Sequence, residues 1–139
     1  MAIQRTPMTR QGYARLKAEL ERLKREERPR ITRAIAEARA HGDLSENAEY
    51  HAAREKQAFV EGRIKELEAK VGNAEVIAPP TGGARVTFGS TLLLRDQDGR
   101  EVRYWIVGSD EAEPSNGKIS IMAPLARTLI GKEVGQVVV

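Results

Sequence analysis

The sequence predicts an α+β fold, in which an N-terminal antiparallel α-helical coiled-coil hairpin is followed by a small antiparallel sheet with one helix. Apolar residues recur every three or four positions in the first half of the chain, as on one face of a helix, and alternate with polar residues after residue 84. A Pro- and Gly-rich segment at 78–83 separates the two patterns. We therefore expect two domains, at residues 1–78 and 79–139.

The first helical pattern runs from about Gln11 to Ala40. Thr9 is suited to cap its start and Gly42 its end. Pro29 removes one backbone donor, so we expect it to bend the helix without ending it, because the apolar pattern resumes beyond it. The apolar positions of this helix are Leu16, Leu20, Leu23, Ile31, Ala34, Ile35 and Ala38.

The second helical pattern runs from about Glu46 to Gly72. Folded back antiparallel, its apolar residues would meet the leucines of the first helix in a two-stranded coiled coil. Each arm of about 28 residues would be about 40 Å long, and we expect the hairpin to project into solvent. The apolar positions of the second helix are Val60, Ile64, Leu67 and Val71.

Four strands are predicted in the second domain, and the first two flank Asp96–Gly99, a hairpin-turn signal. Pro124–Ile130 opens with Pro and is followed by Gly131, as a short helix would be. Trp105 is expected in the core of the sheet. The predicted strands are Ala84–Arg95, Arg100–Val107, Lys118–Met122 and Gln136–Val139.

The composition excludes several classes of protein. The chain has no Cys, so disulfides and thiolate metal sites are excluded. No apolar run approaches the roughly 20 residues of a membrane span, and the first residues lack the apolar core of a signal peptide. We therefore expect a soluble, cytoplasmic protein without a membrane partner.

The net charge of +3 is unevenly distributed. Residues 1–40 hold eleven Lys and Arg against five Asp and Glu, whereas residues 79–139 hold seven of each. A basic arm beside a neutral body indicates either an acidic partner, such as nucleic acid, or a solvated helix face.

Asp43 and Glu46 lie in the break between the two helical patterns, directly after Gly42. Paired carboxylates at the end of a hairpin can be carried into another molecule's pocket as oxygen ligands for a metal ion. The same Asp-x-x-Glu spacing fits a capping box, in which each side chain binds the other residue's backbone. His41 and His51 have no third ligand at a known metal-binding spacing, so we expect no histidine metal site.

The segment Gly42–Glu55 reads Gly-Asp-Leu-Ser-Glu-Asn-Ala-Glu-Tyr-His-Ala-Ala-Arg-Glu, and further matches lie at Phe88-Gly89, Ile106–Ala112 and Leu129–Lys132. With these motifs the chain resembles, from Pro7 to Val139, the Gre transcript-cleavage factors that bind bacterial RNA polymerase. The resemblance implies that the second domain folds like the FK506-binding prolyl isomerases.

The resemblance also implies a function. The second domain would grip the rim of the polymerase's secondary channel, and the coiled coil would enter it. Asp43 and Glu46 would then help to hold a second Mg²⁺, shared with the polymerase active site and not bound by the free protein. The polymerase would hydrolyse the 3′ end of backtracked nascent RNA, so the chain would stimulate an enzyme without being one, and it would have no small-molecule substrate.

Further residues take roles from the same resemblance. Arg39 and Arg54 flank the hairpin end and would contact RNA phosphate, although a solvated surface is the alternative. Five residues of the second domain would face the polymerase, the alternative being loop and core packing: Asp110, Glu111, Ala112, Pro124 and Leu125.

The chain departs from the family pattern in two places. Ala123-Pro124 stands where the family commonly has Ser-Pro, which removes one polar contact. The chain also stops at Val137–Val139, before the closing turn and last strand of Gre proteins, so we expect the second domain to be short of that strand.

Three other functions remain open at this point. A Gre-like channel binder could block the polymerase active centre and inhibit it. The second domain could act as a prolyl isomerase or chaperone, although its only aromatic residues are Phe88, Tyr104 and Trp105. The hairpin could also be a coiled-coil adaptor, for which the acids at its end would be dispensable.

Overall fold

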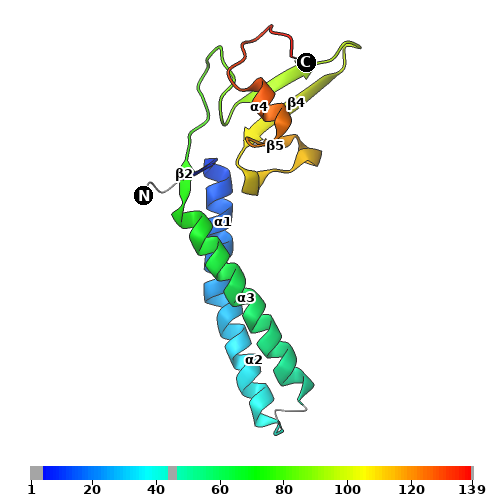
Figure 1. Cartoon of the computed structure of the whole chain (residues 1–139). Coiled ribbons are helices and arrows are strands. Elements are labelled where there is room, and N and C mark those ends of the chain that lie inside the picture. Colours follow the sequence, from blue (N-terminus) through cyan, green and yellow to red (C-terminus); the bar gives the residue numbers. More distant parts are fainter. Residues whose placement is uncertain (1–4, 44–46, 139) are drawn as a thin grey trace. The chain divides into compact units, whose positions relative to one another are not determined.

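The computed structural model describes residues 5–43 and 47–138 (Figure 1). The chain divides into two compact units. One is Ala14–Gly72, and the other joins Met1–Tyr13 to Asn73–Val139. The residues up to Tyr13, which include the start of the first helix, therefore group with the second half of the chain, whereas the sequence predicted them in the hairpin domain.

The predicted helical hairpin is confirmed. Its first arm contains helix α1 (Arg10–Arg22), the π-helical turn η1 (Leu23–Glu27) and helix α2 (Arg28–Ala40), and its second arm is helix α3 (Ala48–Gly72). Figure 1 shows α2 and α3 running side by side. The seam between the arms is lined by apolar residues that recur every three or four positions, except across the π turn, where Leu23 and Ile31 are eight positions apart. The buried residues of the seam are Leu16, Leu20, Leu23, Ile31, Ile35, Ala38, Val60, Ile64 and Leu67.

Pro29 is accommodated by a change of helical hydrogen bonding. In a regular helix its ring would clash with the carbonyl of Arg25, four residues earlier. The chain instead takes the π-helical turn η1 just before the proline, and the Arg28 N–H donates to the Leu23 carbonyl, five residues back. Helix α2 then continues from Arg28. The first arm thus passes Pro29 without ending, as predicted, through a π turn that the sequence analysis did not predict.

Two bidentate ion pairs join the arms. The Arg63 guanidinium donates from Nε and Nη2 to the two carboxylate oxygens of Glu19, at 3.0 Å each. Arg28 donates likewise to Glu61, at 2.8 Å each. The hydrogen bond from Arg63 lowers the pKa of Glu19, and the hydrogen bond from Arg28 lowers the pKa of Glu61. All four side chains are about a third or more exposed, so each pair contributes about 0.2–1 kcal/mol to the free energy of unfolding.

The second unit contains two sheets. Strand β1 (Thr6–Met8) pairs in parallel with strand β2 (Ala74–Val76). Strand β3 (Thr91–Arg95) pairs antiparallel with strand β4 (Glu101–Val107), and β4 pairs in parallel with strand β5 (Lys118–Ser120). The predicted small sheet is present, but it is mixed rather than wholly antiparallel.

The connection between β4 and β5 explains the parallel pairing. It contains two short 3₁₀ helices, η2 (Ser109–Glu111) and η3 (Pro114–Asn116). These turns carry the chain back along β4 as far as Trp105, so that β5 begins opposite Trp105 and runs in the same direction as β4. Gly117 follows with a φ of 75°, and a Cβ there would lie 2.7 Å from the Arg103 carbonyl oxygen. Only glycine therefore fits this return without a shift of the backbone.

Helix α4 (Pro124–Leu129) packs on the sheet where the sequence predicted it, and Gly131 follows it with a positive φ. The core of this unit contains Ile106, Ile119 and Ala126. Trp105 is half-buried and was wrongly expected in this core. It borders a separate cavity of about 170 Å³, and the Lys118 ammonium lies 5.6 Å from its ring centroid.

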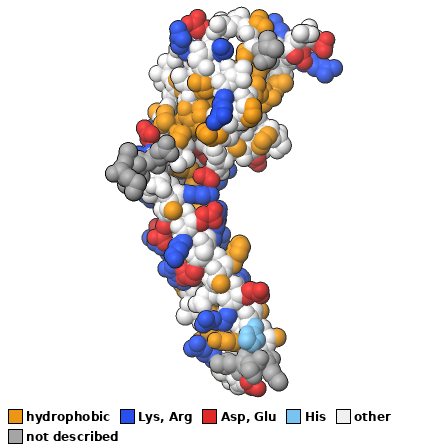
Figure 2. Space-filling view, in the orientation of Figure 1, with side chains coloured by type: hydrophobic (Ala, Val, Ile, Leu, Met, Phe, Trp, Pro, Cys, Tyr) orange, Lys and Arg blue, Asp and Glu red, His pale blue; other side chains and the backbone are white. Residues whose placement is uncertain are grey.

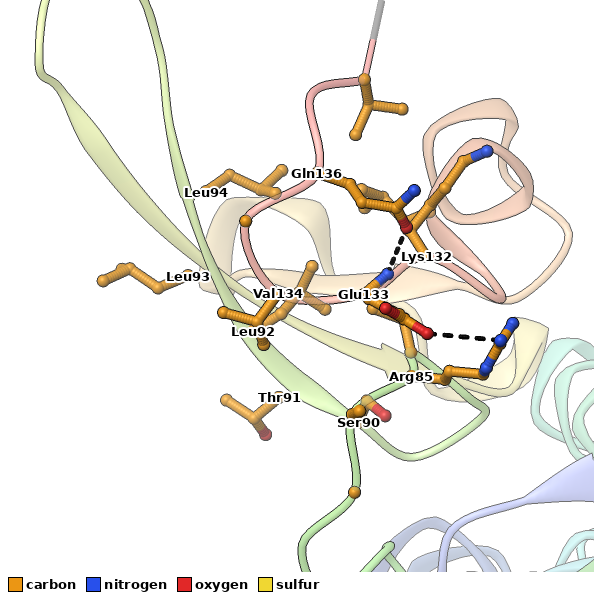
Figure 3. Close-up of a pocket in the computed structure, with 16 residues that line it drawn as sticks. Arg85, Ser90, Thr91, Leu92, Leu93, Leu94, Lys132, Glu133, Val134 and Gln136 are labelled. Carbon is orange, nitrogen blue, oxygen red and sulfur yellow. Dashed lines mark hydrogen bonds and ion pairs between the residues drawn. The ribbon is translucent and has the colours of Figure 1, made fainter.

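Two strand predictions need correction. The strand expected from residue 84 begins only at Thr91, because a turn at 88–89 with a φ of 86° at Gly89 breaks the extended chain. Residues 136–138 do not form the expected strand, and Val139 lies outside the described residues. In Figure 3 the Glu133 N–H donates to Gln136 Oε1 at 2.6 Å, and this turn replaces the extended chain.

The start of α1 is anchored within the second unit by Glu111. Its carboxylate accepts hydrogen bonds from the Thr9 N–H at 3.0 Å, from the Gly108 N–H at 2.9 Å and from the Thr9 hydroxyl. Thr9 also caps α1, as predicted, because its Oγ1 accepts from the Gly12 N–H at 3.1 Å. A Cβ at Gly12 would collide with the Glu111 carboxylate. Glu111 therefore joins the β1–α1 segment to η2.

The ion pairs predict a specific response to acid. The folded state lowers the pKa values of Glu19 and Glu61, so the unfolded chain binds protons first as the pH falls. Their contribution is complete above the unfolded pKa of about 4.3 and is lost as the pH falls through the lower folded values. We expect the E19Q/E61Q variant to lose less stability than the original chain between pH 7 and 3, in thermal unfolding followed by circular dichroism. E37Q, on the exposed face of α2, is the control, and equal pH slopes for all three proteins would contradict the role of these pairs.

The Glu111 anchor predicts a local loss of protection. E111Q keeps the shape of the side chain but faces an amide toward backbone donors, so we expect a loss of about 1–3 kcal/mol in local stability. Amide hydrogen exchange at Thr9 and Gly108 measures it. E113Q, an exposed substitution two residues away, should leave that exchange unchanged. Unaltered protection in E111Q would exclude the anchor.

Candidate functional site at the end of the hairpin

The end of α2 is formed by a glycine cap. The N–H of His41 donates to the Ala38 carbonyl at 3.2 Å, and the N–H of Gly42 donates to the Arg39 carbonyl at 3.3 Å. Gly42 has a φ of 109°, so the predicted C-terminal cap is confirmed. Asp43 follows and is exposed. Glu46, the second predicted acid, lies outside the described residues.

The start of α3 is capped by Asn47. Its Oδ1 accepts from the Tyr50 N–H at 3.0 Å, and its carbonyl accepts from the His51 N–H at 3.1 Å. The capping-box interpretation of Asp43 and Glu46 depends on contacts at position 46, which lies outside the described residues, so it stays a prediction. Helix α3 begins at Ala48, and Asn47 caps it. Asn is among the best N-cap residues, so the sequence contained this signal.

Three contacts between described residues of α2 and its end and those at the start of α3 connect the two helix ends. The Asn47 Nδ2 donates to the Ala38 carbonyl at 2.6 Å. The His41 Nδ1 lies 3.1 Å from Glu49 Oε2. The Arg39 guanidinium lies 5.9 Å from the ring centroid of Tyr50. The segment that carries the predicted acids therefore begins and ends at two helix termini that are joined to each other.

The two arginines predicted to meet RNA are both exposed. Arg39 is in the last turn of α2, beside Tyr50, and Arg54 lies in the second turn of α3. Figure 2 shows Lys and Arg side chains gathered beside a His near this end of the hairpin. This surface can attract a polyanion, in agreement with the basic excess in residues 1–40.

The residues predicted to face a partner in the second unit differ in exposure. Asp110, Pro124 and Leu125 are exposed, Leu125 by 39%, while Ala112 is half-buried. The Glu111 carboxylate is already occupied by backbone donors of its own unit. Sequence reasoning did not detect that internal role, because its partner Thr9 lies 102 residues away in the chain.

A cavity of about 350 Å³ beside β3 was also not predicted (Figure 3). Leu92 and Val134 line it, and an ion pair of 3.2 Å between Arg85 and Glu133 lies at its border. Half of its lining residues are aliphatic, and the charged side chains of Arg85 and Glu133 are paired with each other.

Within residues 5–43 and 47–138, no three or more His, Asp or Glu side chains are grouped closely enough to hold a metal ion. No helix in the same residues is both long and apolar enough to traverse a bilayer.

Comparison with known proteins identifies the family. Residues 6–76 match the family described as transcription elongation factor, N-terminal, and residues 80–139 match transcription elongation factor, GreA/GreB, C-terminal. The chain is 60% identical over 137 residues to transcription elongation factor GreA of Thioalkalivibrio sulfidiphilus, covering 96% of this chain and 87% of that protein. It is 58% identical over 137 residues to the GreA of Alkalilimnicola ehrlichii, with the same coverage.

Solved structures agree. The crystal structure of Thermus aquaticus Gfh1 aligns with a TM-score of 0.50 and 29% identity, over 97% of this chain and 88% of that one. A second structure of the transcription factor Gfh1 aligns with a TM-score of 0.52 and 28% identity, over 99% of this chain and 88% of that one. The hairpin, the mixed sheet and both family matches lead to one conclusion: this chain belongs to the GreA/GreB family of transcription elongation factors.

Proposed function

We propose that this elongation factor binds bacterial RNA polymerase and stimulates the polymerase's own hydrolysis of the 3′ end of backtracked RNA. The second unit binds the rim of the secondary channel, and the hairpin enters the channel. Family membership supports this proposal, and the position of Asp43 carries it, because an exposed carboxylate directly follows the glycine cap at the far end of a helical hairpin.

The dimensions of the hairpin suit delivery of a side chain over a distance. Helix α3 has 25 residues and is therefore about 37 Å long. The seam between the arms is buried, and the remaining faces carry charged side chains, so the hairpin can be surrounded by water or by the walls of a polar channel.

Asp43 and Glu46 are proposed as ligands of a second Mg²⁺ in the polymerase active centre. Carboxylate oxygens are the hard ligands that Mg²⁺ prefers, so the donor set fits the ion. When bound, the ion would stabilise the attacking or leaving oxygen of the phosphodiester. The two acids supply only part of the coordination sphere, and the polymerase and the RNA supply the rest. The chain is therefore a partner in hydrolysis and the polymerase is the enzyme.

The other proposed contacts are secondary to these acids. Arg39 and Arg54 are exposed on the two arms near the hairpin end and would neutralise RNA phosphates. Asp110, Ala112, Pro124 and Leu125 would contact the polymerase rim. Glu111 would contribute by holding η2, through Thr9 and Gly108, in the conformation that presents Asp110.

The test is RNA cleavage in purified, backtracked bacterial elongation complexes with Mg²⁺, with and without the factor. We expect the factor to accelerate release of short 3′ fragments. The D43N/E46Q variant should reduce cleavage to the rate without factor, because both metal ligands become amides, while its affinity for polymerase stays within about twofold, since the second unit is intact.

E37Q/E55Q, which neutralises two exposed acids on the arms, is the matched control and should stimulate as well as the original factor. Undiminished stimulation by D43N/E46Q would exclude the metal role of these acids. Binding without acceleration by the original factor would favour a channel binder that blocks the active centre.

A further inference from the structure

Asn47 is used twice at the end of the hairpin. Its side-chain oxygen caps α3 through the Tyr50 N–H, at 3.0 Å. Its side-chain nitrogen donates to the Ala38 carbonyl of α2, at 2.6 Å. One side chain therefore satisfies a backbone donor at the start of one helix and a backbone acceptor at the end of the other.

This double use depends on the amide group. Ser and Asp also cap helices with an oxygen, but Asp carries no donor when ionised, and the single hydroxyl of Ser is too short to reach both partners. Asn presents an acceptor and a donor on opposite sides of one planar group. A residue selected for capping alone would not need the second function.

The Asn47 bridge is the best shielded of the three contacts between the helix ends. Ala38 is 2% exposed and Asn47 is half-buried. The His41–Glu49 contact is 61% and 72% exposed at its two side chains, so solvent weakens it. The Asn47 bridge therefore helps to fix the separation of Ala38 and Asn47, the two positions on either side of the predicted acids.

We propose that Asn47 is a positioning residue for the acids at the hairpin end, an inference that rests on the proposed function. Asp43 and Glu46 both lie between the two bridged positions, so a fixed separation of those positions restricts where the two carboxylates can be presented together. Mg²⁺ demands nearly ideal octahedral geometry, and a small error in ligand placement therefore weakens its binding. Asn47 contacts neither the metal nor the RNA in this proposal.

The first experiment tests the bridge without polymerase. The chain has no Cys, so E37C and E55C place two spin labels on opposite arms without other changes. Pulsed electron–electron double resonance then measures the distance between the two spin labels. In N47S, which keeps a capping oxygen and loses the bridge, we expect a broader or shifted distance distribution. An unchanged distribution overturns the proposal.

The second experiment measures cleavage at saturating factor as a function of Mg²⁺ concentration. We expect N47S to raise the half-saturating Mg²⁺ concentration by about tenfold, as is typical when the support of a metal ligand is removed. Its affinity for polymerase should stay within about twofold of the original factor. A merely structural role would not shift the Mg²⁺ dependence.

R28A is the matched control, because it removes the Arg28–Glu61 pair on the arms and leaves the helix ends intact. It reports the effect of a less stable hairpin, with the melting temperatures of both variants measured alongside. An Mg²⁺ dependence of N47S like that of the original factor, or like that of R28A, overturns the positioning role. If the original factor stimulates no cleavage, the proposed function fails, and this inference fails with it. If the original factor stimulates cleavage and D43N/E46Q abolishes that stimulation, the proposed function holds, and the result with N47S then tests this inference alone.

Discussion

The apolar seam between the arms is the interaction on which the hairpin depends. Val60, Ile64 and Leu67 of α3 are at most 5% exposed, and they pack against the first arm. Neither arm has another apolar face to bury, so each helix is stabilised mainly by the other. The positions of both helix ends, and therefore of Asp43, follow from the register of this seam.

Register explains why the π turn matters. If the first arm broke at Pro29, the helix beyond it would be rotated. The buried residues after the proline would then no longer face α3. The π turn at Leu23–Glu27 changes the hydrogen bonding around one turn, and the stripe resumes at Ile31. The Arg28–Glu61 and Arg63–Glu19 pairs then connect the arms on either side of this turn. The seam is continuous despite the proline.

The sequence predicted what depends on local pattern. The 3.6-residue period marked both arms, and Gly42 and Pro124 marked helix ends, because capping and backbone restriction act within a few residues. The parallel pairing of β5, the exposure of Trp105 and the Glu111 anchor depend on residues far apart in the chain, which no local period encodes. At the candidate site, Asp43 could be singled out from its surroundings, whereas the bridge from Asn47 to Ala38 requires knowledge of how the two helices lie. The metal-binding roles of Asp43 and Glu46 stay predictions.

The pairing of β1 with β2 has a consequence for how the chain folds during synthesis. Thr6 pairs with Ala74, which lies 68 positions later in the chain. Three residues of parallel strand cannot offset the entropy of closing so long a flexible loop. Once the hairpin has formed, its two arms bring the segments together and most of that entropy has already been lost. Strand β1 is therefore completed late: Thr6–Met8 is synthesised before its partner and can pair only after the hairpin and β2 have followed.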